Sequence, residues 1–271
     1  MMKKSVWLLI VLTCVAVAAS AWAQTPSWHY PVKPLTLEDR SDFLALTTLE
    51  SLISADYAPY HLVDLRLRKT GGDMQLRKEA AEALTRMFEA ATEAGFTLYV
   101  KSAYRSYQTQ KTMYENRLER YGRDDGVVAY PGSSEHQTGL AVDVLNYEWT
   151  QQDGMRPEFA KTPEARWMFD NCARFGFILR YMEDKQDITG IIYEPWHFRY
   201  VGDEVAAYIM DNHLSLEEFT TEYQQAIAAY EAAGGDFVLL CKRERELPPP
   251  LLLNEANAEG DSEVSLFYQE P

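Results

Sequence analysis

Apolar residues recur at helical spacing in several stretches of the chain. Between residues 74 and 94 they include Leu76 and Leu84, and Gly95 suits the end of a helix. Ser106 is placed to cap a second helix that runs to about residue 121. The same spacing, with Pro163 at a helix start and a capping box at Ser215, predicts further helices over 37–53, 163–175, 203–212 and 216–233.

Shorter stretches are alternating or continuously apolar, which is typical of β-strands. They lie at residues 61–65, 96–104, 140–145, 177–181, 189–193 and 198–200, and residues 237–240 fit either a strand or a buried strip. Helices and strands are mixed along the chain, and the late strands have the spacing of hairpins. The pattern therefore predicts an α+β fold with a central antiparallel sheet flanked by helices.

The N-terminal residues have a different character from the rest. Lys3 and Lys4 precede an apolar run over 6–19, and Ala21 and Ala23 are the small residues that a signal peptidase reads. We expect an exported protein, located in the periplasm, the cell envelope or the extracellular space, with no stable membrane span in its mature chain. The expected organisation is a signal peptide over 1–23, a lead-in over 24–49, the main domain over 50–213, an extension with a helix over 214–253 and a disordered tail over 254–271.

Composition and charge narrow the partners. Hydrophobic residues make up 46% of the 271 residues, which indicates a globular protein. The formal net charge of -15 repels phosphate backbones, so we expect no nucleic-acid partner. We also expect the protein to be a monomer. Cys172 and Cys241, which remain after residue 23, fit either one disulfide or two small buried side chains.

One acidic residue interrupts the apolar strand over 140–145. Asp143 is flanked by valines, so its carboxylate is expected to be buried on at least one face of the sheet. A buried carboxylate without a partner is costly and needs a cation or hydrogen-bond donors. A salt bridge to Arg105 or Arg199 is one way to satisfy Asp143, and a bound metal ion is the other.

Two histidines favour the metal. His136 lies seven residues before Asp143, and Gly139 lets the intervening chain turn so that both side chains reach one point. His197 supplies a third ligand from another strand. Two imidazoles and one carboxylate with an open fourth position form the ligand set of a catalytic zinc site.

Glu194 is placed to act as a base beside that metal. It would take a proton from a water whose pKa the metal lowers. Glu194 and His197 are three residues apart, so in a straight strand their side chains would point to opposite faces. We therefore expect a bend or a single helical turn at Pro195 that brings them to the same side.

Over roughly residues 50–213 the chain resembles the VanY-type D-alanyl-D-alanine carboxypeptidases. The resemblance is carried, in the family's order, by Ser-Ala-Tyr-Arg-Ser-Tyr-Gln-Thr-Gln at 102–110, Ser-Glu-His-Gln-Thr-Gly-Leu-Ala-Val-Asp at 134–143 and Glu-Pro-Trp-His at 194–197. It implies a hedgehog/D-Ala-D-Ala-peptidase-like fold and one Zn²⁺ ion. It also implies that His136, Asp143 and His197 are the zinc ligands and that Glu194 is the catalytic base.

The resemblance implies substrate-binding residues as well. Arg105 is expected to contact the substrate near the scissile bond, where its guanidinium can brace an oxyanion or a terminal carboxylate. Gln110, Ser134, Tyr104 and Trp196 match positions that line the substrate pocket. Their alternatives are a surface position on a helix for Gln110, a hydrogen bond within the loop for Ser134, and core packing for the two aromatic residues.

The implied function is hydrolysis of the terminal D-alanine from peptidoglycan stem peptides. A variant is an L,D-carboxypeptidase or an endopeptidase on the same peptides, because the depth of the pocket decides between them and the sequence does not give it. A different class is a non-catalytic cell-wall-binding module, which the presence of Glu194 disfavours. An envelope scaffold that acts through residues 214–271 is a third possibility.

Overall fold

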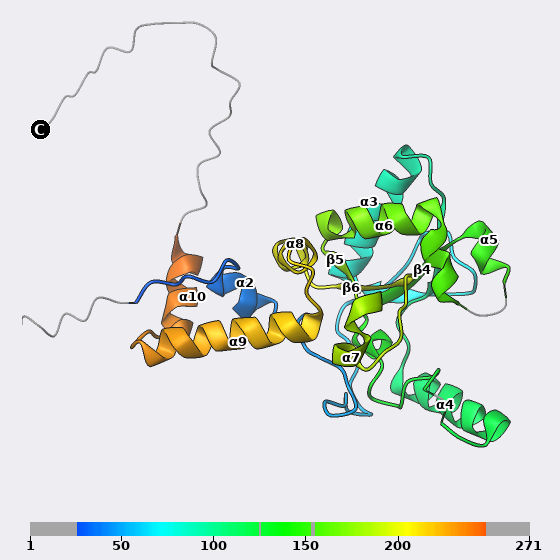
Figure 1. Cartoon of the computed structure of the whole chain (residues 1–271), viewed down its shortest axis with the longest axis horizontal. Coiled ribbons are helices and arrows are strands. Elements are labelled where there is room, and N and C mark those ends of the chain that lie inside the picture. The colour runs from blue at the N-terminus through cyan, green and yellow to red at the C-terminus, as the bar shows by residue number, and fades with distance from the viewer. Residues whose placement is uncertain (1–25, 125, 153–154, 248–271) are drawn as a thin grey trace, which may run out of the picture.

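The computed structural model describes residues 26–124, 126–152 and 155–247. The predicted signal peptide over 1–23 and the predicted tail over 254–271 lie outside these ranges. An antiparallel four-stranded sheet with the strand order β3-β4-β6-β5 forms the centre of the protein. Its strands are β3 (Leu98–Ser102), β4 (Ala141–Asn146), β5 (Phe177–Leu179) and β6 (His197–Tyr200). The predicted α+β fold is confirmed (Figure 1).

Helices flank this sheet. They are α3 (Lys78–Glu93), α4 (Tyr107–Tyr121), α5 (Tyr147–Thr150), α6 (Pro163–Asn171), α7 (Gln186–Thr189) and α8 (Asp203–Asp211). A two-stranded hairpin of β1 (Leu62–Asp64) and β2 (Gln75–Arg77) precedes α3. Short 3-10 helices, η1 (Glu135–Thr138), η2 (Pro157–Lys161), η3 (Cys172–Phe175) and η4 (Glu183–Lys185), connect the larger elements.

The main hydrophobic core joins the sheet to α3 and α6. Leu84 on α3, Val144 on β4, Met168 on α6 and Phe198 on β6 all belong to this cluster of buried side chains. Every residue of β4 is buried, because the strand lies inside the sheet between β3 and β6. A central strand of this kind is held on both edges, so it gives the single acid within it, Asp143, a rigid frame.

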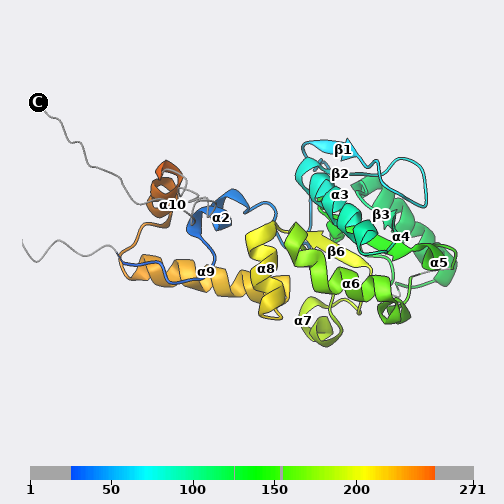
Figure 2. The ribbon, with the colours of Figure 1, turned by 90° about the horizontal axis from the view of Figure 1, so that it is seen from above.

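A second, smaller core lies beside the first. It is formed by α8, α9 (Leu216–Ala232), α2 (Pro34–Asp39) and the segment before α2, with α10 (Phe237–Glu246) packed against them. Figures 1 and 2 show α2, α9 and α10 together as an arm that extends away from the sheet, with α8 between. The described residues of the predicted lead-in and of the predicted extension, 26–49 and 214–247, thus contribute to one core, although they are distant in sequence.

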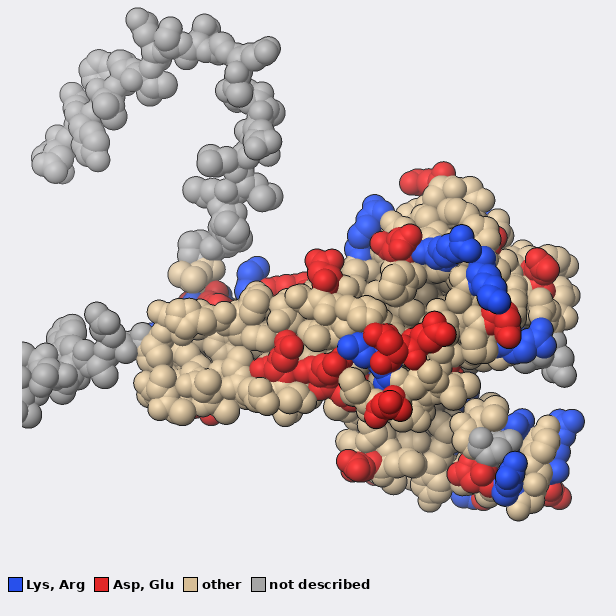
Figure 3. All heavy atoms as spheres, in the orientation of Figure 1, with Lys and Arg blue, Asp and Glu red and all other residues tan. Residues whose placement is uncertain are grey.

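Polar contacts tie the arm's two chain segments together. The backbone N–H of Leu35 donates to Glu244 at 3.0 Å, and Arg245 pairs with Glu38 at 3.0 Å. Trp28 packs its ring against Tyr230 on α9. On the face shown in Figure 3, acidic side chains gather where α9 meets the rest of the molecule, whereas basic ones lie mainly over the sheet-bearing part and α4.

Two predicted helices begin or end elsewhere. The helix predicted over 37–53 overlaps only the end of α2, which stops at Asp39, and later in the same range the hydroxyl of Thr48 accepts hydrogen bonds from the backbone N–H groups of Glu50 and Ser51 in a turn. The helix predicted from residue 74 begins at Lys78, and residues 75–77 pair as β2 with β1.

Two predicted strands are wrong. Thr189 ends the short helix α7, and its hydroxyl accepts from the N–H of Ile191, so a local turn replaces strand pairing over 190–193. Residues 237–240, predicted as a strand or a buried strip, begin helix α10, because the carboxylate of Asp236 accepts from the N–H of Leu239 and caps it.

The cysteines and the hydropathy of the helices add two facts. Cys172 and Cys241 are both buried and carry free thiols, so the second of the two sequence alternatives describes them. Among the residues that the structure describes, no helix has both the length and the apolar character needed to cross a bilayer.

Candidate metal centre

Three elements of the sheet region bring together the predicted ligands. His136 lies on η1, Asp143 is the third residue of β4 and His197 is the first residue of β6. Asp143 and His197 are direct partners across the antiparallel pair of β4 and β6, so their side chains project from the same face of the sheet. Gly139, with φ of 70°, ends η1 in the left-handed region and turns the chain from His136 into β4.

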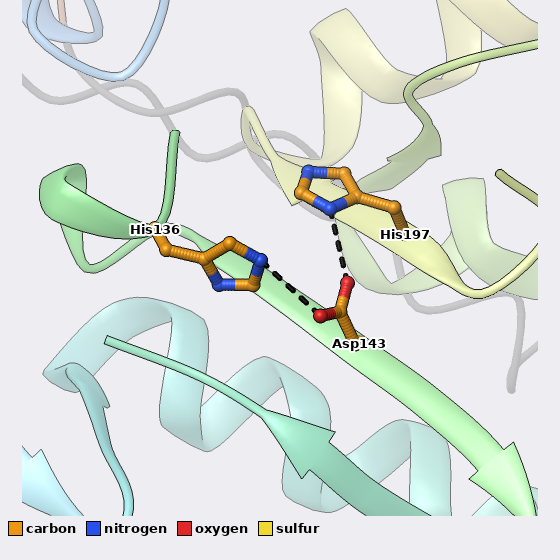
Figure 4. Close-up of side chains that lie close together, drawn as sticks. All are labelled: His136, Asp143 and His197. Atoms are coloured by element: carbon orange, nitrogen blue, oxygen red, sulfur yellow. Dashed lines mark hydrogen bonds and ion pairs between the residues drawn. The ribbon is translucent and has the colours of Figure 1, made fainter. Parts of the chain in front are cut away.

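The three side chains converge on one point (Figure 4). Nδ1 of His197 lies 3.0 Å from Oδ1 of Asp143, and Nε2 of His136 lies 3.3 Å from Oδ2 of the same carboxylate. One ligand atom from each residue lies within 4.8 Å of the others. All three residues are at least 95% buried, so the carboxylate between the rings has little access to bulk solvent.

The hydrogen bonds of the rings indicate which nitrogen atoms are free to bind a cation. Nδ1 of His136 lies 2.8 Å from the carbonyl oxygen of Ala103, which can only accept, so Nδ1 carries the proton and Nε2 has a lone pair. Nε2 of His197 faces the carboxylate of Glu135 at 3.5 Å, which favours a proton there and leaves the lone pair on Nδ1. Two imidazole lone pairs and a carboxylate therefore point at one place, and this donor set fits a zinc ion.

Glu194 lies beside this centre. The backbone N–H of His197 donates to the carbonyl of Glu194 at 3.1 Å, which closes a turn through Pro195 before β6 begins. The turn brings Oε2 of Glu194 to 3.7 Å from Nδ1 of His197. The expected bend is present, and the side chain of Glu194 is 23% exposed, whereas that of His197 is 5% exposed.

Burial and charge act in opposite directions at these groups. Burial raises the pKa of Asp143, but the neighbouring histidines outweigh it and hold that pKa well below its usual range. Burial lowers the pKa of His197, yet its hydrogen bond to Asp143 and the nearby carboxylates of Glu135 and Glu194 raise it to about 9. Burial also lowers the pKa of His136, against the attraction of Asp143. For Glu194, burial and the nearby acids together raise the pKa to about 7.

Arg105 lies at the same site, and side-chain hydrogen bonds orient its guanidinium. Its Nη1 donates to the side chain of Gln110 at 2.7 Å and its Nη2 to the hydroxyl of Ser102 at 3.0 Å. Burial lowers the pKa of Arg105, and the charges of Asp143 and Glu194 oppose that effect. The alternative of a salt bridge from Arg105 or Arg199 to Asp143 is absent among the described ion pairs, since Asp143 pairs with the two histidines and Arg199 lies against Glu135.

The remaining predicted pocket residues have different surroundings. Gln110 is fully buried, and its amide bridges Arg105 to the carbonyl of Ala129, so it is not a surface residue of α4. Ser134 is buried at the start of η1. Trp196, at 3% exposure, packs in the main core, which is the alternative to a pocket wall. Tyr104 is half-buried, directly before Arg105.

The sequence reasoning missed Glu135, Arg180 and Glu217 at this site, and it assigned Arg199 the wrong candidate partner. Glu135 is buried next to His136, and its Oε1 accepts from Arg180 at 2.8 Å and lies 2.9 Å from Nη1 of Arg199. Arg180 also binds Glu217 on α9. Both arginines interrupt apolar strand sequences, as Asp143 does, so the argument that identified Asp143 was available for them too.

Comparison with known proteins adds to this geometry. Residues 73–203 match the VanY family, described as D-alanyl-D-alanine carboxypeptidase. The YodJ protein of Bacillus subtilis (strain 168), named as a carboxypeptidase, is 40% identical over 192 residues, which cover 68% of this chain and 69% of YodJ. The family match spans the segments that carry His136, Asp143 and His197.

Solved structures agree. The structure of the LdcB LD-carboxypeptidase, which concerns peptidoglycan recognition, has 39% sequence identity and a TM-score of 0.62, and the match covers 68% of this chain and 88% of LdcB. A mutant of the vancomycin resistance D,D-pentapeptidase VanY, in complex with Zn(II), has 33% identity and a TM-score of 0.52, and the match covers 66% of this chain and 99% of that one.

Proposed function

Because the chain belongs to the VanY family of D-alanyl-D-alanine carboxypeptidases, we propose that it removes the terminal D-alanine from peptidoglycan stem peptides by metal-assisted hydrolysis. The observation that carries the proposal is the convergence of His136, Asp143 and His197 on one point, with the carboxylate of Glu194 beside it. A non-catalytic wall-binding module has no need of that carboxylate.

The ligands fit zinc, which, when bound, supplies Lewis-acid chemistry: it polarises a carbonyl and lowers the pKa of a water. His136, Asp143 and His197 would hold it, while Glu194 takes a proton from the attacking water and passes that proton to the departing amine. With its pKa raised to about 7, Glu194 lies in the range where a group both accepts and returns a proton near neutral pH. The positive charges of His197 and Arg105 favour the carboxylate form of Glu194 at the start of the reaction.

Arg105 is suited to hold the end of the substrate. Gln110 and Ser102 use two of its five N–H donors, so the guanidinium is oriented and retains donors for a ligand. A planar guanidinium binds a carboxylate through two parallel hydrogen bonds. We propose that Arg105 binds the C-terminal carboxylate of the stem peptide or the oxyanion that forms at the scissile bond.

The bond that is cut has two candidates. The family description favours the D-Ala-D-Ala bond. An L,D-carboxypeptidase is the second candidate, because the LdcB LD-carboxypeptidase has higher identity and a higher TM-score with this chain than the VanY D,D-pentapeptidase has. Both reactions release D-alanine and use the same site.

Synthetic stem peptides separate these candidates. The purified, zinc-loaded protein is incubated with peptides that end in D-Ala-D-Ala, L-Lys-D-Ala or diaminopimelate-D-Ala, and released D-alanine is measured by mass spectrometry. Hydrolysis of the first peptide alone supports the D,D activity, and hydrolysis of the other two supports the L,D activity. If zinc-loaded protein releases D-alanine from none of them, the proposed function is wrong.

Glu194→Gln tests the proposed base. The amide keeps the size of the side chain but cannot accept the proton, so we expect kcat to fall by about 10²–10⁴-fold. Zinc content is expected to stay unchanged, because Glu194 is not among the proposed ligands. Glu119→Gln removes the same charge from the exposed surface of α4 and is the matched control. Wild-type turnover in Glu194→Gln would rule out this mechanism.

A further inference from the structure

A chain of polar contacts leads from the metal centre to helix α9 of the arm. Oε2 of Glu135 faces Nε2 of His197 at 3.5 Å, and neither atom has a hydrogen-bond partner among the described residues. Oε1 of Glu135 accepts from Nε of Arg180 at 2.8 Å. The other end of Arg180 donates to both oxygens of Glu217, at 2.9 Å and 2.6 Å.

We propose that Glu217 is a positioning residue of the metal site, and that it fixes the ligand ring of His197 through Arg180 and Glu135. The proposal rests on the proposed function in one respect, that His197 binds the metal. Helix α9 of the arm would thereby contribute to metal binding, although it carries none of the three proposed ligands.

Arg180 is built to transmit this effect. The side chain of Arg180 is 1% exposed, and its guanidinium binds two acids, the buried Glu135 and Glu217 on α9. The backbone N–H of Arg180 also donates to the carbonyl of His197 at 3.2 Å. Arg180 therefore contacts His197 directly through its backbone N–H, and it acts on the imidazole ring of His197 indirectly, through Glu135. A displacement of Arg180 moves both contacts.

Charge balance explains why the second acid is needed. Glu135 lies within ion-pair distance of two buried arginines, Arg180 and Arg199, which leaves an excess positive charge next to a site for a divalent cation. Glu217 neutralises Arg180 with a bidentate pair, the strongest geometry available to a guanidinium. Glu135 then remains free to orient His197. Hydrogen-bond partners of this kind, behind a metal ligand, set its orientation and its basicity.

The start of α9 holds Glu217 in place. Ser215 and Glu218 form a capping box that fixes the first turn. Glu218 also pairs with Lys185 at 3.0 Å, five residues after Arg180. Glu217 and Glu218 thus both bind α9 to the segment that follows β5, but only Glu217 pairs with Arg180, which contacts His197.

That difference defines the experiment. Zinc affinity is measured by competition with a chelating dye for the wild-type protein, Glu217→Gln and Glu218→Gln, and the unfolding midpoint is measured in parallel. Glutamine at position 218 can still complete the capping box, so Glu218→Gln removes mainly the ion pair with Lys185. We expect Glu217→Gln to weaken zinc binding by about 10–100-fold, and Glu218→Gln to leave it unchanged.

A double-mutant comparison separates positioning from loss of stability. If Glu217 acts through Glu135, then the variant Glu135→Gln/Glu217→Gln loses less zinc affinity than the sum of the two single losses. Glu217→Asp keeps the charge, and we expect it to retain most of the affinity; it also serves should the glutamine variant not fold. Wild-type zinc affinity in a folded Glu217→Gln, full additivity in the double variant, or equal losses at positions 217 and 218 would each overturn the inference. Absence of zinc binding in the wild-type protein would instead overturn the proposed function.

Discussion

Buried charged side chains around the centre are paired with opposite charges. Arg77, at 1% exposure, binds Asp42 at 2.7 Å, and Arg180 and Arg199 both lie against Glu135. A buried pair tolerates the loss of one member poorly, because the remaining charge is left without compensation. Asp143 follows the same rule with two histidines as its partners, which become cationic only when protonated. A metal ion meets its need for positive charge without protonating both rings.

Alanine at either histidine is expected to remove the metal. His136→Ala and His197→Ala each delete one of three ligands, and we expect zinc content to fall from about one ion per chain to near zero at micromolar zinc. D-alanine release is expected to fall at least about 10²-fold. Elemental analysis of the purified variants measures the first effect and peptide hydrolysis the second.

The control for these variants is His29→Ala. His29 is exposed in the segment before α2, so its loss removes a histidine without touching the centre. Full zinc content in both His136→Ala and His197→Ala would mean that these rings are not ligands.

The residues that the sequence identified are those whose chemistry conflicts with their surroundings. An acid among valines, and histidines within three residues of a glycine or a proline, are local signals, and with them the sequence predicted that His136, Asp143 and His197 converge. The same signal at Arg180 and Arg199 indicates only that partners exist. Which acid each arginine binds depends on the packing of α9 and η1, and no local pattern specifies that.

At the scale of elements, the turn after η1 does most to shape the centre. Gly139 has a φ of 70°, and a Cβ there would lie 3.0 Å from Cδ2 of Leu62 and 3.3 Å from Cγ of Arg77. Its carbonyl accepts from the backbone N–H of Arg77 at 2.8 Å, which seats the turn against β2. The hairpin of β1 and β2 therefore sets the distance between His136 and β4.

Gly139→Ala is expected to cost about 2–4 kcal/mol of stability. About 1–2 kcal/mol comes from an alanine in the left-handed region, and the rest comes from crowding against Leu62 and Arg77. The matched control is Gly122→Ala, since Gly122 also has a φ of 70° but no atom within 4 Å of the added Cβ. Chemical denaturation measures both. Equal losses in the two variants would show that crowding at Gly139 contributes nothing.

Helices that begin after a capping serine start where the sequence predicted them to start. α4 begins after Ser106 and α9 after Ser215, as expected. The wrong elements are short or rich in hydroxyl residues. In 37–53 and 189–193 the side chains of Thr48 and Thr189 bind nearby backbone groups, and these local bonds replace the helix or strand that hydropathy alone favours.

At the scale of the whole molecule, the two cores meet at the centre. β6 begins with His197 and packs Phe198 and Tyr200 in the main core, and α8, which follows β6, packs in the second core. Glu217 on α9 reaches back to Arg180 beside β5. Metal binding is therefore expected to stabilise both parts together, because the ligands and their supporting residues come from segments that only the folded chain brings together.

Metal removal tests this coupling. A ligand that binds only the folded state stabilises it by about 4 kcal/mol when its free concentration is a thousandfold above Kd. For a chain of this size that corresponds to a rise in Tm of about 8–16 °C. We expect zinc-loaded protein to unfold in one transition at the higher temperature, and chelator-treated protein to unfold at the lower one. His197→Ala should show the lower Tm with or without zinc. Calorimetry measures these transitions. A zinc-dependent rise in Tm that is equally large in His197→Ala would mean that the stabilising ion binds elsewhere. Two separate transitions, with only one shifted by zinc, would mean that the arm folds independently of the metal centre.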